Sequence, residues 1–129
     1  QIQGSLAVPA WQPTADPTTR ALDPEARDAH ARSRVPLVHY SATASGWFAG
    51  RDGAGYDTPD NRARRERARA LAARRGVTPT QIALAWLWAT DAPTVACFST
   101  GDPDHLAEIC AADALTLAPD EARWLASGE

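Results

Sequence analysis

The side chains best suited to acid–base catalysis are His39 and Tyr56, and neither lies in a setting that indicates a reaction. His39 stands in an apolar run, where strand alternation turns it away from Val38 and Tyr40. A satisfied interior or helix-facing histidine is therefore favoured over a catalytic one. Tyr56 lies in a loop rich in glycine and aspartate, as either a lid residue or part of the surface. The chain has no lysine, which excludes a Schiff base, a P-loop and any lysine-assisted acid–base site within it.

Neither the acidic residues nor the two cysteines have the spacing of a metal site. Asp52, Asp57 and Asp60 share one loop, but their spacing fits no calcium-binding loop and is better explained by turns. Cys97 and Cys110 match no common zinc pattern and are too few for a disulfide framework. We therefore predict no metal site. We expect both cysteines to be buried apolar residues of a protein kept in a reducing, cytoplasmic compartment.

A dense run of arginines lies between residues 61 and 75. It could bind nucleic acid or phosphate groups, but the whole chain carries a net charge of −3. A solvated helix face, with Ala68, Leu71 and Ala72 turned inward, is therefore favoured, and no nucleic-acid partner is expected. The seven arginines are Arg62, Arg64, Arg65, Arg67, Arg69, Arg74 and Arg75.

The composition is that of a packed domain. Of the 129 residues, 44% are hydrophobic and 22% are charged, which excludes disordered and collagen-like chains. There is no apolar run of about 18 residues and no secretory signal pattern, so no membrane partner is expected. Methionine is absent as well as lysine, and the abundance of alanine and arginine is typical of a bacterial genome rich in G and C.

Strand-like and helix-like segments alternate along the chain. Apolar runs predict strands at residues 1–8, 35–40 and 94–98. Residues 41–60 and the proline-rich segment around Trp11 are predicted loops. This alternation implies a parallel sheet covered by helices. N-cap residues followed by proline help to place the helices, which we expect at 23–34, 61–75, 78–92, 102–112 and 118–128.

The order of several motifs resembles the aldo/keto reductase family. The stretches that resemble its last strands and helices are Gln1–Gln3, Val35–Gly50, Gly76–Leu87, Asp102–Glu108 and Leu117–Leu125. That family is a (β/α)8 barrel of the TIM type, and it binds NADPH in an extended pose at the C-terminal ends of the strands. The resemblance implies that residues 1–129 are the C-terminal half of such a barrel, with about the last three strands and their helices.

The resemblance also implies a site for a dinucleotide cofactor, NADP or NAD. Gln1 falls where the family binds the nicotinamide carboxamide, and Tyr40 matches the aromatic residue that stacks on the nicotinamide ring. The turn at residues 41–46 matches the loop over the pyrophosphate, where small residues let backbone N–H groups approach phosphate oxygens. The full set implied is Gln1, Tyr40, Ser41, Thr43, Ser45, Gly46, Ser99, Thr100, His105 and Glu108.

Departures from the family pattern concern the adenosine end of this site. Ser99–Gly101 supplies two hydroxyls where the family usually places a cation for the 2′-phosphate. The preference between NAD and NADP is therefore open. Glu108 matches a family acid near the adenine, and His105 stands where some members carry an arginine. His105 either faces the phosphate or caps the helix toward solvent.

The resemblance implies carbonyl reduction by an intact enzyme. The family's catalytic Tyr, Lys, Asp and His come from the first four strands, which this chain does not contain, so no catalytic residue is assigned and the chain alone is expected to be inactive. The start within a strand and without methionine favours a truncated protein, a fragment or one partner of a split barrel. The alternative is a non-catalytic module of the same fold, used for nucleotide sensing or protein interaction.

Three parallel strands leave two edges that proteins rarely expose. Either the missing strands are therefore expected to come from another copy of the chain or from another chain, or the half barrel is strongly remodelled. A compact, monodisperse monomer would contradict this expectation.

Overall fold

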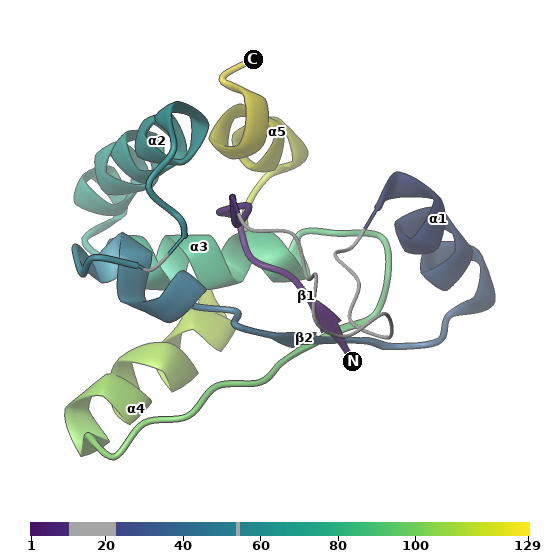
Figure 1. Ribbon diagram of the computed structural model, residues 1–129, viewed down its shortest axis with the longest axis horizontal. Coiled ribbons are helices and arrows are strands. Elements are labelled where there is room, and N and C mark those ends of the chain that lie inside the picture. Colours follow the sequence, from purple (N-terminus) through teal and green to yellow (C-terminus); the bar gives the residue numbers. More distant parts are fainter. Residues whose placement is uncertain (11–22, 54) are drawn as a thin grey trace.

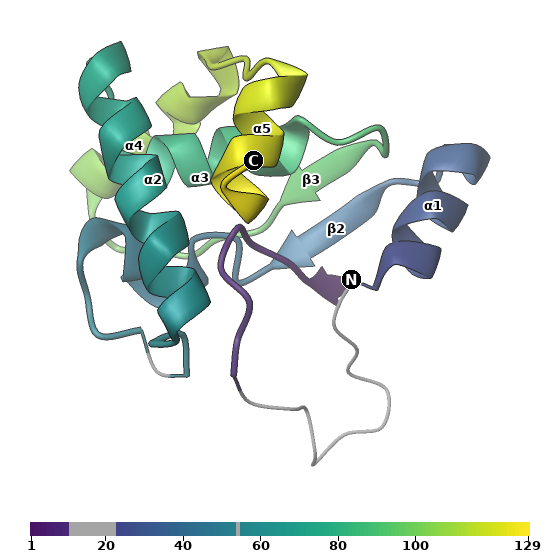
Figure 2. The ribbon, with the colours of Figure 1, turned by 90° about the horizontal axis from the view of Figure 1, so that it is seen from above.

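The computed structural model describes residues 1–10, 23–53 and 55–129, so most of the predicted loop around Trp11 lies outside the described residues. Three parallel strands form one sheet in the order β1–β2–β3 (Figure 2). The strands are β1 (Ile2–Gln3), β2 (Leu37–Tyr40) and β3 (Thr94–Ala96). The α-helices are α1 (Pro24–Ser33), α2 (Pro59–Arg75), α3 (Pro79–Trp88), α4 (Pro103–Ala111) and α5 (Pro119–Ser127), and the short 3₁₀ helices are η1 (Ala44–Ala49) and η2 (Ala112–Ala114). These elements confirm an α/β fold with a parallel sheet.

The two faces of the sheet differ in burial. Leu37 and His39 of β2 are buried, whereas Val38 and Tyr40, which point to the opposite face, are half-buried. Val95 of β3 pairs with Val38 and stays 50% exposed. One face of the sheet is therefore packed inside the molecule, and the other keeps apolar side chains at the surface.

Four helices begin with the same local chemistry, a capping side chain followed by proline at the first helical position. Proline fits there because its missing N–H has no partner in the first helical turn. Asp23 caps α1 by accepting from the Ala26 N–H (2.7 Å). Thr78 and Gln81 form a reciprocal capping box at the start of α3. These starts confirm the predicted helices at 23–34, 78–92 and 102–112 to within a few residues at each end.

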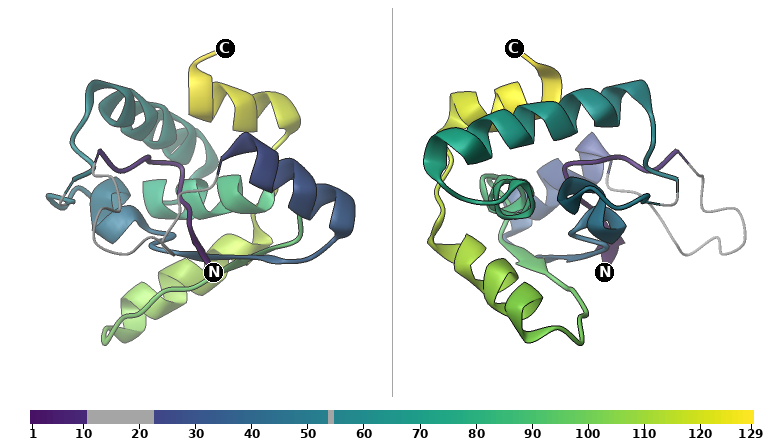
Figure 3. Two further views of the ribbon diagram at one scale, coloured as in Figure 1. Left: turned by 45° about the vertical axis from the view of Figure 1, so that its right-hand side comes forward. Right: turned by 90° about the vertical axis from the view of Figure 1, so that its left-hand side faces the viewer.

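Helix α3 lies between α2 and α4 in the middle of the molecule (Figure 3). Most of its side chains are buried, as a helix apolar nearly all round requires. Helix α2 turns Ala68, Leu71 and Ala72 into the same core, which confirms the predicted inward face.

The sequence analysis favoured a solvated arginine face on α2, but part of this face is bonded to α5. Arg64 Nε donates to the Ala126 carbonyl and Arg67 Nε to the Leu125 carbonyl, each at 3.1 Å. These carbonyls belong to the last turn of α5, where backbone oxygens lack partners within the helix. Part of the arginine run therefore binds α2 to α5.

Three other predictions need correction. The strand expected at 1–8 is regular only over Ile2–Gln3, and the predicted loop 41–60 contains η1 and the start of α2. Cys97 and Cys110 are exposed instead of buried. Cys97 follows β3, which pairs only with β2 among the described strands, and Cys110 lies on the outer side of α4 next to the buried Ile109.

Helix α1 stands apart from the other helices, at the side of the molecule opposite α2 and α4 (Figure 1). It contributes no buried residue to the core. Within the described ranges, no helix is long and apolar enough to cross a membrane.

Candidate functional site

A pocket with a volume of about 490 Å³ lies beyond the C-terminal ends of β2 and β3. Loops that follow strand ends supply the binding sites of parallel α/β folds, because they converge at one edge of the sheet. Six of the ten residues predicted to bind a dinucleotide line this pocket: Thr43, Ser45, Gly46, Ser99, His105 and Glu108. The remaining lining residues are Ala49, Arg51, Thr80, Asp102 and Asp104.

The wall after β2 is a tight turn with left-handed backbone. Ser41, Ala44 and Ser45 have φ values of 56°, 50° and 54°, and Gly46 follows at 82°. Left-handed non-glycine residues cost about 1–2 kcal/mol each, and such strain is often found at binding sites. Bonds from the Ala44 N–H to the Ser41 carbonyl (2.8 Å) and from the Gly46 N–H to the Thr43 carbonyl (3.1 Å) hold the turn. The turn therefore presents short side chains and backbone to the pocket.

Arg51 is a cation in this pocket that the sequence analysis did not assign. Its backbone N–H bonds to the Gly46 carbonyl (3.2 Å). A Cβ atom on Gly46 would lie 2.7 Å from Arg51 Cδ, so the side chain packs directly over the glycine. The signal in the sequence was the position of Arg51, the first cation after the glycine-containing turn. Arg51 could bind a phosphate group through paired N–H donors.

The opposite wall is the segment from Ser99 to the start of α4. Asp102 caps α4 by accepting at Oδ1 from the N–H groups of Asp104 (2.9 Å) and His105 (3.4 Å). Thr100 Oγ1 lies 3.2 Å from His105 Nδ1 and accepts from the Asp102 N–H (3.1 Å). Thr100 thus stands directly behind the pocket lining, and His105 is linked to it instead of standing free in solvent.

Glu108 lines the pocket and also binds α4 to the start of α3. Its carboxylate accepts from the Thr78 hydroxyl, and its backbone carbonyl accepts from Gln81 Nε2 (2.9 Å). Glu108 therefore has a structural role that the resemblance did not imply, in addition to its position in the pocket.

Thr80 is a second residue that the sequence analysis missed. It is only 2% exposed, it lines the pocket, and its hydroxyl has no hydrogen-bond partner among the described residues. A buried hydroxyl without a partner costs about 1–3 kcal/mol. A bound molecule with a polar group at this point would satisfy it.

Gln1, Tyr40 and Ser41 lie outside this pocket. Gln1 is exposed at the start of β1, and Tyr40 ends β2, with Gln3 of β1 as its neighbour in register. The Tyr40 hydroxyl is buried and has no partner among the described residues. The pocket therefore does not include the residues assigned to the nicotinamide end, and their role there stays a prediction.

Tyr56 is neither a lid nor a surface residue, because it is 2% exposed and belongs to the main core. Its hydroxyl accepts a hydrogen bond from Gln3 Nε2 (3.1 Å). Burial raises the pKa of the Tyr56 phenol, and the hydrogen bond from Gln3 opposes that rise. Tyr56 is therefore a neutral core residue that supports β1.

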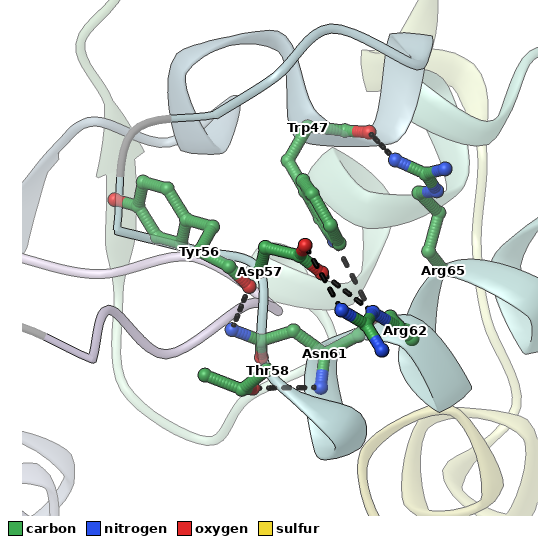
Figure 4. A network of polar contacts seen from close by, with 7 residues as sticks. All are labelled: Trp47, Tyr56, Asp57, Thr58, Asn61, Arg62 and Arg65. Carbon is green, nitrogen blue, oxygen red and sulfur yellow. Dashed lines mark hydrogen bonds and ion pairs between the residues drawn. The ribbon is translucent and has the colours of Figure 1, made fainter.

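The carbonyl of Tyr56 accepts a hydrogen bond from Asn61, whose side chain joins several segments (Figure 4). Asn61 is fully buried, and its Nδ2 donates to the carbonyls of Val8 (2.7 Å) and Tyr56 (2.8 Å). Its Oδ1 accepts from the Val8 N–H and from Arg64 Nη1, both at 3.0 Å. The segment after β1 is thereby attached to α2.

His39 is buried on the packed face of the sheet, as strand alternation predicted. The predicted hydrogen-bond satisfaction is wrong, since Nδ1 has no partner among the described residues and lies against Gly4. Burial lowers the pKa of the His39 imidazole, and the charges of Arg27 and His30 lower it further. His39 is therefore an uncharged packing residue.

The acidic loop residues serve as ordinary surface groups. Asp57 forms an exposed ion pair with Arg62 (2.6 Å), which holds the pKa of the Asp57 carboxyl below its usual value. Across the part of the chain that the structure describes, no three His, Cys, Asp or Glu side chains are grouped closely enough to hold a metal ion.

A parallel sheet with a pocket beyond the C-terminal ends of its strands is typical of parallel α/β folds, both barrels and open sheets. Comparison with protein families matches residues 8–127 to the Aldo/keto reductase family. The chain therefore belongs to the aldo/keto reductase family.

Comparison with solved structures gives the same fold. The chain is similar to a thermostable aldo-keto reductase, Tm1743, solved in complex with the inhibitor epalrestat, with a TM-score of 0.67 and 24% sequence identity. The match covers 98% of this chain and 38% of that reductase. Among curated proteins, no sequence match was found.

Proposed function

We propose that this chain is the cofactor-binding C-terminal part of an NAD(P)H-dependent oxidoreductase of the aldo/keto reductase type, in the form of a partial (β/α)8 barrel. The observation that carries the proposal is the pocket itself. It gathers six predicted residues from two segments that are about 50 residues apart in the sequence, and it adds Arg51. The length of the match, 38% of the reductase, supports a part of a barrel over a complete one.

The residues of the pocket fit the phosphate groups of a dinucleotide. Arg51 supplies positive charge, Ser45 supplies a hydroxyl, and the left-handed turn at 44–46 brings backbone close to the pocket. The buried Thr80 hydroxyl, which has no partner among the described residues, adds a polar group to the lining. Arg51 would hold the pyrophosphate, and the segment 99–108 would hold the adenosine.

Gln1 and Tyr40, which lie outside the pocket, would position the nicotinamide ring. A bound dinucleotide would supply hydride for carbonyl reduction. The Tyr40 ring would limit the orientation of the nicotinamide ring by stacking on it. The chain has no lysine, and the family's proton-donating residues belong to strands outside it, so it would bind without reducing a carbonyl.

Replacing Arg51 with glutamine is expected to weaken NADH and NADPH binding about tenfold, because one charged hydrogen bond to a phosphate is worth about 1.5–3 kcal/mol and solvent reduces it at the surface. Binding is measured from the fluorescence of the five tryptophans during titration. Arg32→Gln is the matched control, since Arg32 is an exposed arginine on α1, away from the pocket.

The proposal fails if neither dinucleotide binds the chain below about millimolar concentration, or if Arg32→Gln weakens binding as much as Arg51→Gln does. Carbonyl reduction by the isolated chain would contradict the expected lack of activity. Binding without reduction fits both the proposed half enzyme and a nucleotide-sensing module of the same fold.

We further propose that another copy or another chain supplies the missing barrel strands. Apolar side chains support this, because Val95 is 50% exposed on the sheet face that also holds Val38, and Phe98 is 40% exposed beyond β3. Sedimentation equilibrium of the isolated chain is expected to show association. A compact, monodisperse monomer at about 100 µM would contradict the supply of strands by another copy, because the free energy of self-association would then be weaker than about 5.5 kcal/mol.

The predicted bacterial origin and cytoplasmic location belong to the same proposal. The two free cysteines are both exposed, a state that a reducing compartment preserves.

A further inference from the structure

We infer that the pocket selects NAD(H) over NADP(H), with Asp102 and Asp104 as the residues that determine this specificity. The two cofactors differ only at the adenosine ribose, which carries a 2′-hydroxyl in one and a 2′-phosphate in the other. The inference rests on the proposed function, because it concerns which dinucleotide the proposed site accepts. It follows from the charges around the pocket.

The start of α4 is already occupied by the protein's own carboxylate. A helix N-terminus attracts phosphate because its first N–H groups lack partners within the helix. Here Asp102 Oδ1 accepts from two of these groups, the N–H of Asp104 and the N–H of His105. A 2′-phosphate would have to displace this cap or lie beside a negative charge.

Two further carboxylates, Asp104 and Glu108, line the same wall. Among the described residues that line the pocket, Arg51 is the only arginine. Arg51 is fixed to the turn after β2, because its backbone bonds to Gly46 and its side chain packs on that glycine. The wall formed by residues 99–108 therefore has three carboxylates, whereas Arg51 is anchored on the turn after β2.

A ribose with free hydroxyls suits this wall. Carboxylates accept hydrogen bonds from a ribose diol, the arrangement by which acidic residues favour NAD in other dinucleotide sites. The Thr80 hydroxyl, 2% exposed and without a partner among the described residues, adds a polar group at the same pocket. A 2′-phosphate would meet like charge from Asp102 and Asp104, which stand exposed at the mouth.

The experiment compares NADH and NADPH on the same chain by tryptophan fluorescence and by calorimetry. We expect NADH to bind at least about tenfold more tightly at low salt. The double variant Asp102→Asn and Asp104→Asn should bind NADPH about tenfold more tightly than the parent chain, while NADH binding is unchanged or weaker. Asparagine still caps a helix, so α4 is retained in this variant.

Asp113→Asn is the matched control. It removes the same charge from an exposed position in η2, at the other end of α4, and should leave the preference unchanged. Added salt provides a second readout, because screening by about 0.5 M salt should reduce the discrimination against NADPH if charge causes it.

The possible results distinguish failure of the proposed function from failure of the inferred specificity. If neither dinucleotide binds, the proposed function is wrong. If both bind with equal affinity, or NADPH binds more tightly, the proposed function stands and the inferred specificity is overturned. A preference for NADH that the double variant and salt leave intact would also overturn the role given to Asp102 and Asp104.

Discussion

Replacing Asn61 with aspartate is expected to destabilise the folded chain by about 2–5 kcal/mol. The exchange preserves the size of the side chain and removes both hydrogens that Nδ2 donates to the carbonyls of Val8 and Tyr56. A carboxylate oxygen would then face two carbonyl oxygens in a fully buried position. The bond from Arg64 to Oδ1 would stabilise the new charge only in part.

The measurement is urea unfolding of the variant and the parent at several pH values. A buried carboxyl has a raised pKa, so its neutral form is favoured in the folded state. The destabilisation should therefore be smallest below about pH 4, the ordinary range of aspartate in the unfolded chain, and should grow as the pH rises. Asp60→Asn changes the neighbouring, exposed position and should alter stability by less than about 1 kcal/mol. Equal stability of Asn61→Asp and the parent at pH 7 would show that the Asn61 side-chain hydrogen bonds do not hold the fold.

Asn61 supplies hydrogen bonds that a neighbouring strand would otherwise supply to the segment after β1. The predicted first strand is regular only over two residues, and the chain after it has no sheet partner for the Val8 backbone among the described strands. The side chain of Asn61 pairs with both polar groups of Val8, as a neighbouring strand would. Asn61 also holds the loop that carries Tyr56 through the Tyr56 carbonyl. Tyr56 in turn accepts the hydrogen bond from Gln3 of β1.

Local chemistry made much of the fold predictable. Helices α1, α3 and α4 could be located from Asp23, Thr78 and Asp102, because a cap followed by proline acts within a few residues. The apolar run before Tyr40 predicted β2 for a similar reason. The order of these elements then supported the resemblance that the family comparison confirms.

The errors have a common cause, which is contact between distant parts of the chain. Tyr56 sits in a polar loop, and its burial depends on Gln3, which is 53 residues away. Thr80 looks like an ordinary residue of a helix start, and only the arrangement of α3 beside the pocket gives its hydroxyl a possible role. The cysteines appeared to be core residues from their type alone, yet their exposure depends on which elements cover β3 and α4.

The candidate site shows the same division. The turn at 41–46 was predicted from its resemblance to the family, whereas Arg51 became a candidate only once its packing on Gly46 was known. The preference between NAD and NADP was open in the sequence because hydroxyls at 99–100 favour neither cofactor. The Asp102 carboxylate on the first N–H groups of α4 is the observation that supports the inferred preference for NAD.

Replacing Gly4 with alanine is the second change with a large expected effect. A Cβ atom at this position would lie 2.0 Å from His39 Nδ1 and 2.7 Å from Cε1. The His39 ring is 2% exposed, so the clash must move either the ring into its packed surroundings or the β1 backbone away from β2. We expect a loss of about 1–3 kcal/mol, or more if the bond from the Gly4 N–H to the Tyr40 carbonyl breaks.

Urea unfolding tests this expectation against two references. Gly101→Ala adds the same methyl group where no atom lies within 4 Å, and it should change stability by less than about 0.5 kcal/mol. In a chain that already carries His39→Ala, the cost of Gly4→Ala should fall below about 1 kcal/mol, because the colliding ring is absent. An unchanged cost in that background would mean that backbone conformation, and not the imidazole, requires glycine at position 4.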